Sequence, residues 1–393
     1  MKLVTHTKWE INIRDVYSGI IAFLPIFMYI NIPGINLGLG TVLLIITVPY
    51  ALTKKIIVKK EIKELPFFLL LGYLLLKSTD EVINVLILLI IIMHIHGALN
   101  GSINCRVVRK IMQCVAVCAT YCVIIQLIFY YLLGIRFSFL PSFLVADEFK
   151  YYYTTEIQSI YRASAFFLEP SHYSQYICIS LLFTFFPEDN RKPDIAKAFW
   201  IILGCLLTTS GIGIALCIGV LGWYLLFNRM KSGKKIIYIF IGMVAAVLIF
   251  LVLMQIPLFA FSIQRIFGEV DGYNAIEGRT WLWDAYIGTM STNERIVGLG
   301  VSNIPKGYMT GLMHMIYCYG YIGLAIMVFV YIYLFIKSKS VTARCVCAMY
   351  IAMLPLANLV GAIYICFWLC MIISNKTDYQ SLTSNFKSTL ISK

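Results

Sequence analysis

The chain has 393 residues, of which 60% are hydrophobic and 13% are charged. Soluble domains are typically about 45–50% apolar and about 25% charged, so this composition excludes an ordinary soluble domain. Long apolar stretches separated by short charged segments instead indicate membrane spans of roughly 20 residues each. The net charge of +13 would also suit a nucleic-acid partner, and the positions of the basic residues decide between these interpretations.

Apolar stretches bounded by charged or turn-forming residues predict about twelve transmembrane helices. In the first half of the chain they cover residues 16–31, 35–53, 65–76, 82–97, 111–134 and 172–187. In the second half they cover residues 198–208, 212–227, 236–256, 312–336, 345–356 and 359–373. No small-x-small cleavage site follows the first stretch, so we expect it to be retained as a span. The expected fold is an all-α, polytopic membrane protein in which residues 1–393 form a single membrane domain.

Lysine and arginine predict the orientation of these spans. If the N-terminus is cytoplasmic, the cytoplasmic segments hold 24 of the 32 basic residues and the outer segments hold eight. The outer side nevertheless includes the two longest loops, 135–171 and 257–311. Because cytoplasmic loops of membrane proteins are enriched in basic residues, we expect both termini in the cytoplasm and both large loops outside. The positive charge therefore indicates orientation, and no nucleic-acid partner is expected.

Cysteines and histidines are the candidate metal ligands, and the sequence favours packing for them. All twelve cysteines fall in predicted spans or in a cytoplasmic loop, where disulfides are not expected. Cys114, Cys118 and Cys122 share one helix face without a nearby histidine or carboxylate, so helix packing explains them better than a metal. His94 and His314 are likewise interpreted as packed or solvated side chains, and no metal or other cofactor is expected.

The first outer loop ends in a polar cluster, Arg162-Ala-Ser-Ala-Phe-Phe-Leu-Glu169-Pro170-Ser171-His172. Pro170 suits the first turn of a helix and Glu169 suits its N-cap, so free N–H groups and the positive end of the helix dipole would face the outer side. Such a helix end attracts phosphate, and Arg162 would add a planar, permanently charged guanidinium. The alternative is an ordinary helix cap beside a surface arginine.

The second outer loop contains Gly278-Arg279-Thr280-Trp281-Leu282-Trp283-Asp284, which predicts a turn and a short amphipathic helix capped by Thr280. Its aromatic side chains would lie at the membrane surface and hold Arg279 at the depth of a lipid-linked pyrophosphate. A simple anchor to lipid headgroups is the alternative. Farther on, Gly298-Leu-Gly300-Val-Ser-Asn303 is interpreted as a glycine turn within the loop.

In this order, the motifs resemble those of a known family. The stretch from Arg162 to Tyr173 is similar to the R-x-[SG]-x-F-x-E-P-S-H stretch of bacterial O-antigen and capsular repeat-unit polymerases. The second half of that family is resembled by Gly278-Arg279-x-x-x-Trp283, by Gly298-Leu-Gly300 with Asn303, and by Gly320-Tyr-Ile-Gly323-Leu. The resemblance covers roughly residues 150–330 and the layout of many spans with two large outer loops.

The resemblance implies a metal-independent glycosyltransferase in the bacterial cytoplasmic membrane, which polymerises undecaprenyl-pyrophosphate-linked oligosaccharides at the outer face. Its implied partners are these lipid-linked substrates, membrane lipids, a chain-length regulator and a flippase. The expected catalytic residues are Arg162, Glu169, His172 and Arg279. The expected substrate-binding residues are Arg265, Tyr161, Trp283 and Asn303. The arginines would neutralise the pyrophosphate, and Glu169 or His172 would accept the proton of the acceptor hydroxyl.

Three alternatives remain open from the sequence. O-antigen ligases share the fold and the arginine-bearing loops, but Met309-Thr310 occupies the position of their outer-loop His-Asn pair, which favours a polymerase. A lipid-linked oligosaccharide flippase or other transporter would usually carry ionisable residues inside its spans, and the predicted spans contain no Asp, Glu, Lys or Arg. A scaffold subunit of a polysaccharide export complex is the third alternative.

Overall fold

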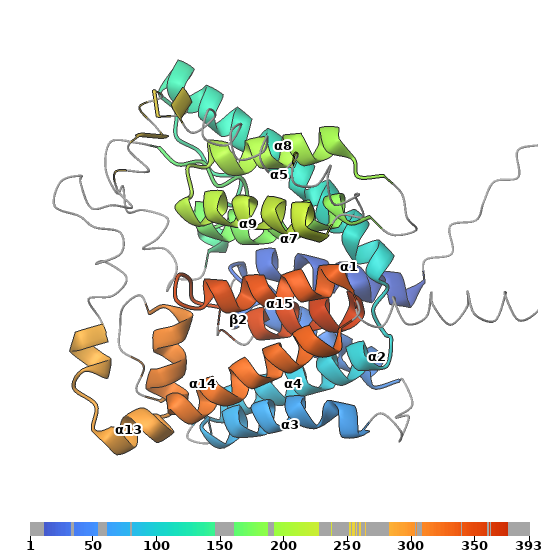
Figure 1. Cartoon of the computed structure of the whole chain (residues 1–393), viewed down its shortest axis with the longest axis vertical. Coiled ribbons are helices and arrows are strands. Elements are labelled where there is room, and N and C mark those ends of the chain that lie inside the picture. The colour runs from blue at the N-terminus through green and yellow to red at the C-terminus, as the bar shows by residue number, and fades with distance from the viewer. Residues whose placement is uncertain are drawn as a thin grey trace, which may run out of the picture.

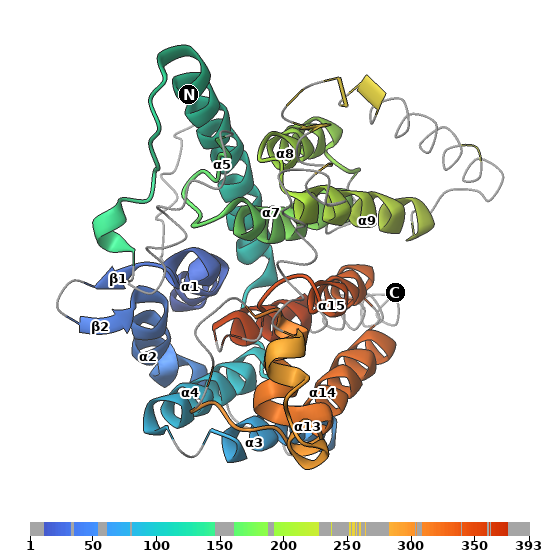
Figure 2. The ribbon, with the colours of Figure 1, turned by 90° about the vertical axis from the view of Figure 1, so that its left-hand side faces the viewer.

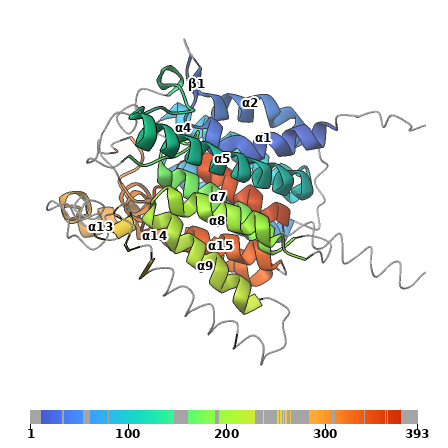
Figure 3. The same ribbon diagram turned by 90° about the horizontal axis from the view of Figure 1, so that it is seen from above.

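The computed structural model of the chain is mostly helical, as the sequence predicts. It describes residues 12–32, 35–53, 61–78, 81–145, 161–187, 192–227, 237, 251–252, 254–255, 257, 259–260, 264, 283–302, 304, 309–338, 340–359, 361 and 363–375. Among these residues, three helices are long and apolar enough to cross a membrane, namely α4 (Val82–Leu99), α5 (Cys105–Leu133) and α14 (Gly311–Lys337). Many of the helices run roughly side by side, as Figure 1 and the view from above in Figure 3 show.

Shorter helices pack with these three to form the described bundle. They are α1 (Ile13–Phe27), α2 (Leu39–Leu52), α3 (Glu61–Leu76), α7 (Pro170–Phe185), α8 (Ile195–Leu207), α9 (Gly211–Phe227) and α15 (Val341–Met353), followed by a last helix at Ile363–Asn375. Eleven of the twelve predicted apolar stretches coincide with one of the helices named so far, and both predicted breaks within long apolar runs are confirmed. The twelfth stretch, 236–256, lies almost wholly outside the described residues.

A small hairpin corrects the expectation of an entirely α-helical fold. Strands β1 (Asn31–Ile32) and β2 (Ile35–Gly38) pair in an antiparallel arrangement between α1 and α2. An isolated bridge joins Ile30 to Val145, which follows α5 in the chain. The sequence between the strands contains Pro33, which lacks the N–H that a continuing helix requires. The second predicted span is therefore a strand followed by a helix.

The helix ends that the sequence predicts for the cytoplasmic side meet at one end of the bundle. Arg14 in α1 donates to the carbonyl of Ile103 (2.9 Å), which precedes α5. Arg109 in α5 donates to the carbonyl of Phe186 after α7 (3.1 Å) and to the side chain of Asn375 in the last helix. The hairpin and the short helix α13 (Thr292–Val297) lie at the other end, towards the viewer in Figure 2.

The core between the helices is rich in aromatic side chains. It also contains a buried histidine, His94, whose two ring nitrogens both have hydrogen-bond partners. His94 of α4 is 0% exposed, and its Nε2 lies 2.9 Å from the carbonyl oxygen of Leu44. Because a carbonyl can only accept, Nε2 carries the proton, and Nδ1 accepts from the hydroxyl of Tyr17 (2.8 Å). Of the two alternatives that the sequence leaves open for His94, a packed or a solvated side chain, the structure shows the packed one.

Candidate functional site

The N-terminus of α7 forms where the sequence predicts it. Pro170 is the first helical residue and Glu169 is the N-cap residue. The Glu169 side chain makes no capping hydrogen bond to the helix. Its Oε2 instead accepts a hydrogen bond from the hydroxyl of Ser171 (2.9 Å). The position of Glu169 at the cap is therefore confirmed, and its carboxylate is oriented by a neighbouring hydroxyl group.

The residues before α7 are folded into the bundle, and a glutamine of α5 holds them. Ala165 is 0% exposed and has a φ of 54°, a left-handed conformation that residues other than glycine rarely adopt. Gln126 is 1% exposed, and its Oε1 accepts from the N–H of Ala165 (2.8 Å). Its Nε2 donates to the carbonyl of Ala165 (3.1 Å) and to that of Phe137 (3.2 Å). The side-chain amide thus pairs with both backbone groups of Ala165, which compensates for the strained backbone.

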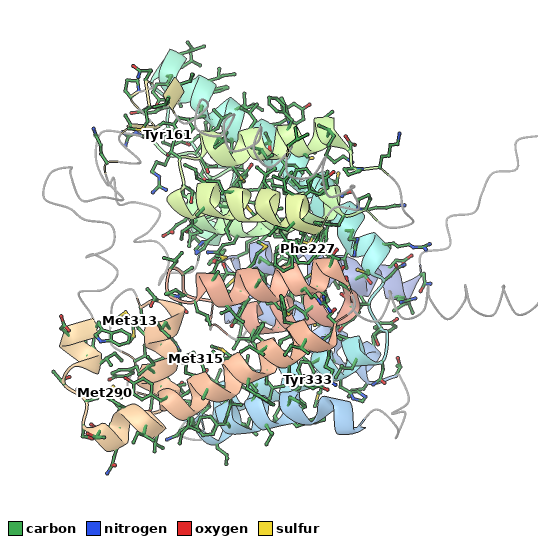
Figure 4. The ribbon with its side chains drawn as sticks, in the orientation of Figure 1. Tyr161, Phe227, Met290, Met313, Met315 and Tyr333 are labelled. Carbon is green, nitrogen blue, oxygen red and sulfur yellow. The ribbon has the colours of Figure 1, made fainter. Side chains whose placement is uncertain are left out.

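Tyr161 and Arg162 begin this folded segment, and both are half-buried. The hydroxyl of Tyr161 donates to the carbonyl of Phe137 (2.9 Å), and its ring stacks on Tyr130 with centroids 4.7 Å apart. Figure 4 places Tyr161 at the left-hand side of the bundle, the same side as Met290 and Met313. Tyr161, which the sequence predicts to bind substrate, anchors the segment to α5 in the structure, and Arg162 follows it directly.

His172 lies in an aromatic cluster that three distant parts of the chain build. Its ring stacks on Tyr29, which follows α1, with centroids 4.8 Å apart and an interplanar angle of 15°. Tyr364 of the last helix lies 6.4 Å away, and the hydroxyls of Tyr29 and Tyr364 are hydrogen-bonded to each other. His172 Nδ1 is buried and has no hydrogen-bond partner among the described residues. The two tyrosines enclose the imidazole on the side of α1 and the last helix.

Sequence reasoning missed Gln126, Tyr29 and Tyr364. Gln126 carried a usable signal, because an amide inside a predicted span must find a partner in the protein interior. The two tyrosines carried none, since no spacing or motif links residues 29, 172 and 364, and only the folded chain brings them together.

The second of the two loops that the sequence predicts to lie outside contributes less to the described site. Trp283 begins a single helical turn, η3 (Trp283–Ile287), is half-buried and packs against the hydrophobic core. The structure therefore brings Tyr161, Arg162, Glu169 and His172 into one segment and gives Trp283 a packing contact. The other candidates, Arg265, Arg279 and Asn303, lie outside the described residues, as does the predicted cap residue Thr280.

The glycine turn of that loop packs against a break in α14. Gly320 has φ 67° and ψ −178°, values that are not helical, and Figure 1 shows α14 as two arms meeting at an angle. Leu299 N–H donates to the carbonyl of Tyr317 (2.8 Å), and Gly300 N–H donates to that of Cys318 (2.9 Å). A Cβ atom on Gly298 would lie 2.5 Å from Gly320 N. The interpretation of this turn as a loop is correct, and the glycines allow two backbones to touch.

Two basic residues near this turn bind backbone carbonyls. Lys77 Nζ donates to Gly298 (3.2 Å), while Arg295 donates through Nε to Ile287 (3.1 Å) and through an η nitrogen to Gly288 (2.7 Å). Such contacts fix α13 against η3, and the glycine turn after α13 against the end of α3. Lys77 and Arg295 therefore have structural roles at this end of the bundle.

The acidic residue Glu294 at this end stabilises the start of its own short helix, α13. Glu294 of α13 accepts a hydrogen bond from the N–H of Ser291 (2.7 Å), and Ser291 Oγ accepts from the N–H of Glu294 (3.3 Å), which together form a capping box. The backbone hydrogen bond lowers the pKa of the Glu294 carboxyl, because it favours the charged form. At this end, the described residues bring no three His, Cys, Asp or Glu ligand atoms together.

Comparison with models of protein families, with curated proteins and with solved structures finds no match.

Proposed function

We propose that this chain is a multi-span glycosyltransferase of the bacterial cytoplasmic membrane that polymerises undecaprenyl-pyrophosphate-linked oligosaccharide repeat units into O-antigen or capsular polysaccharide. In this proposal both termini are cytoplasmic and the ends of α5 and α7 near Tyr161 face outwards. The shorter apolar helices cross the membrane together with α4, α5 and α14, giving about twelve spans. The substrates and membrane lipids are the partners, with a chain-length regulator and a flippase acting beside it.

The observation that carries the proposal is the segment from Arg162 to His172. A loop that only anchored the chain to lipid headgroups would need no buried glutamine to fix a left-handed alanine beneath it. Here the segment is held against α5 at Ala165 and enters α7 with Glu169 at the cap. A fixed segment keeps its polar side chains in one geometry, which an electrostatic catalytic site requires.

The proposed reaction needs positive charge and a proton acceptor. A hydroxyl of the acceptor sugar attacks the anomeric carbon of the donor, the bond to the pyrophosphate oxygen breaks, and the bonding electrons leave with the pyrophosphate. Arg162, together with Arg279 from the second loop, would neutralise the leaving group by paired hydrogen bonds. Arginine remains protonated at neutral pH, so this contribution needs no metal and no proton transfer.

Glu169 is the better candidate for the proton acceptor. Its carboxylate is half-exposed and oriented by Ser171. The ring of His172 is stacked on Tyr29 with Tyr364 beside it, an arrangement that suits a positioning residue. In this proposal Glu169 accepts the proton of the acceptor hydroxyl, and His172 holds the first turn of α7 against α1 and the last helix.

Glu169→Gln tests this assignment directly. The amide is nearly isosteric and can still accept from Ser171, but it cannot take up a proton, so polymer formation should fall by about 10²-fold or more while protein abundance stays normal. Glu156→Gln, in the same predicted outer loop, is the matched control and should retain activity. The measurement is polymer length and amount in cells that depend on each variant. Equal polymer from both variants would remove Glu169 from the mechanism.

A further inference from the structure

A second cluster of reactive side chains lies among α7, α8 and α9. Cys178, Cys205 and Cys217 come from three different helices, and their Sγ atoms all lie within 4.8 Å of one another. Two of these thiols are 0% exposed and the third is 3% exposed. Among the described residues, this is the one place where three candidate metal-ligand atoms converge. We propose that Cys178, Cys205 and Cys217 form a binding site for a soft monovalent metal ion, Cu(I).

The spacing of the sulfur atoms fits such an ion. Metal–sulfur bonds of about 2.3 Å place the ligand sulfurs roughly 3.8–4.0 Å apart in tetrahedral or trigonal geometry. The Sγ atoms of Cys178 and Cys217 are 3.8 Å apart. A disulfide would need about 2.0 Å and would leave one thiol over. The three side chains therefore need small rotations to bind one metal ion.

The helices approach one another closely at this level because two glycines permit it. A Cβ atom on Gly204, directly before Cys205, would overlap the hydroxyl of Tyr173. A Cβ atom on Gly213, one turn before Cys217, would overlap the hydroxyl of Ser174. Both neighbours are on α7, which packs against α8 and against α9. The trio is thus held at a point of close contact among three helices, and its thiols cannot move far apart without separating them.

The donor set selects the ion. Thiolates favour soft ions such as Cu(I) and Zn(II), whereas Mg²⁺ and Ca²⁺ require oxygen ligands. Structural Zn(II) sites have four protein ligands, and Zn(II) sites with three protein ligands hold a water in the fourth position. Here three sulfurs are the complete set of converging ligand atoms that the described residues offer, and their residues are at most 3% exposed to solvent. Cu(I) accepts three sulfur ligands, so the trio can satisfy it. Binding displaces thiol protons to solvent and involves no electron transfer.

The test uses the purified full-length chain in detergent, kept reduced and anaerobic. Cu(I) is titrated in competition with a Cu(I)-specific chelator, and about one ion per chain should be retained. Cys178→Ala, Cys205→Ala and Cys217→Ala should each weaken retention at least about tenfold. Cys347→Ala is the control, because Cys347 is 0% exposed but lies in α15 outside the trio. Equal retention by all variants, or retention of Zn(II) in preference to Cu(I), would overturn the proposal.

X-ray absorption at the copper edge on the wild-type protein gives a measurement that does not depend on the folding of a variant. A shell of three sulfur atoms is expected around the metal. A shell containing nitrogen or oxygen, or two sulfur atoms only, would overturn the assignment to this trio. Neither measurement depends on glycosyltransferase activity.

Discussion

Two irregular segments lie at the same end of the bundle and are stabilised in different ways. The segment before α7 is held by a side chain, since the amide of Gln126 pairs with the backbone of Ala165. The glycine turn before α14 is held by backbone against backbone, where Gly298 touches the break at Gly320. A segment fixed from beneath by one side chain keeps its own polar side chains available. The glycines that touch in the second segment offer no side chains at the point of contact, so that contact suits a scaffold, whereas the first segment suits a functional site.

The sharpest way to break this comparison is Gly320→Ala. The left-handed φ and the overlap of the new Cβ with the carbonyl of Ile296 should destabilise the fold by at least about 1–3 kcal/mol. Gly222→Ala in α9 is the matched control, because its Cβ would meet open space. Thermal unfolding of both variants in detergent is the measurement. An unchanged midpoint for Gly320→Ala would show that the backbone contact does not hold the second segment.

Gln126→Leu tests the first segment. The substitution keeps the size of the side chain but removes the partners of the Ala165 N–H and carbonyl, at about 1–3 kcal/mol for each unmet buried group, while the carbonyl of Phe137 keeps the hydroxyl of Tyr161. Hydrogen exchange at residues 161–169 should become faster, while exchange in α13 stays unchanged. Gln113→Leu is the control, because Gln113 is half-buried on the same helix and donates to Thr184 alone (3.3 Å). Unchanged exchange at 161–169 would mean that other contacts fix this segment.

The smallest expected effect concerns the capping box of α13. The pKa of Glu294 is lowered by the hydrogen bond from Ser291, so the carboxylate stabilises α13 fully above the unfolded pKa of about 4.3 and loses that effect as the pH falls through the lowered value. Glu294→Gln keeps the capping hydrogen bonds and removes the charge. Wild type should therefore protect the amides of α13 slightly better than the variant at neutral pH, and equally well once the carboxyl is protonated. If wild type still protected the amides of α13 better than Glu294→Gln in acid, the charge of Glu294 would not be the cause of the stabilisation.

Local physical rules were sufficient for most of the fold. Apolar stretches with turn-forming breaks gave the positions of α7, α8, α9 and α15, and the Glu-Pro pair gave the start of α7. The hairpin at residues 31–38 was missed because its apolar residues were read as part of a span. Apolar content alone does not distinguish a short strand from the first turn of a helix.

Contacts between side chains that lie far apart in the chain could not be predicted from such local rules. Cys114 and Cys118, which share a helix face in the sequence, are exposed, so the packing interpretation is wrong for them within this chain. The cysteines that do converge come from three helices and follow no common spacing. The tyrosines around His172 were missed for the same reason. Helical periodicity predicts which residues share one face, but the contacts between faces depend on tertiary packing.

Reconstituted polymerisation tests the central claim most directly. The purified chain, supplied with undecaprenyl-pyrophosphate-linked repeat units and EDTA, should produce polymer, because arginine charge replaces a metal in the proposal. Arg162→Lys should lower the yield about 10²-fold at equal protein level, since lysine keeps the charge but loses the two-pronged contact with the pyrophosphate. No polymer from the wild-type protein, or equal polymer from Arg162→Lys, would contradict the proposal that the segment before α7 is a catalytic site.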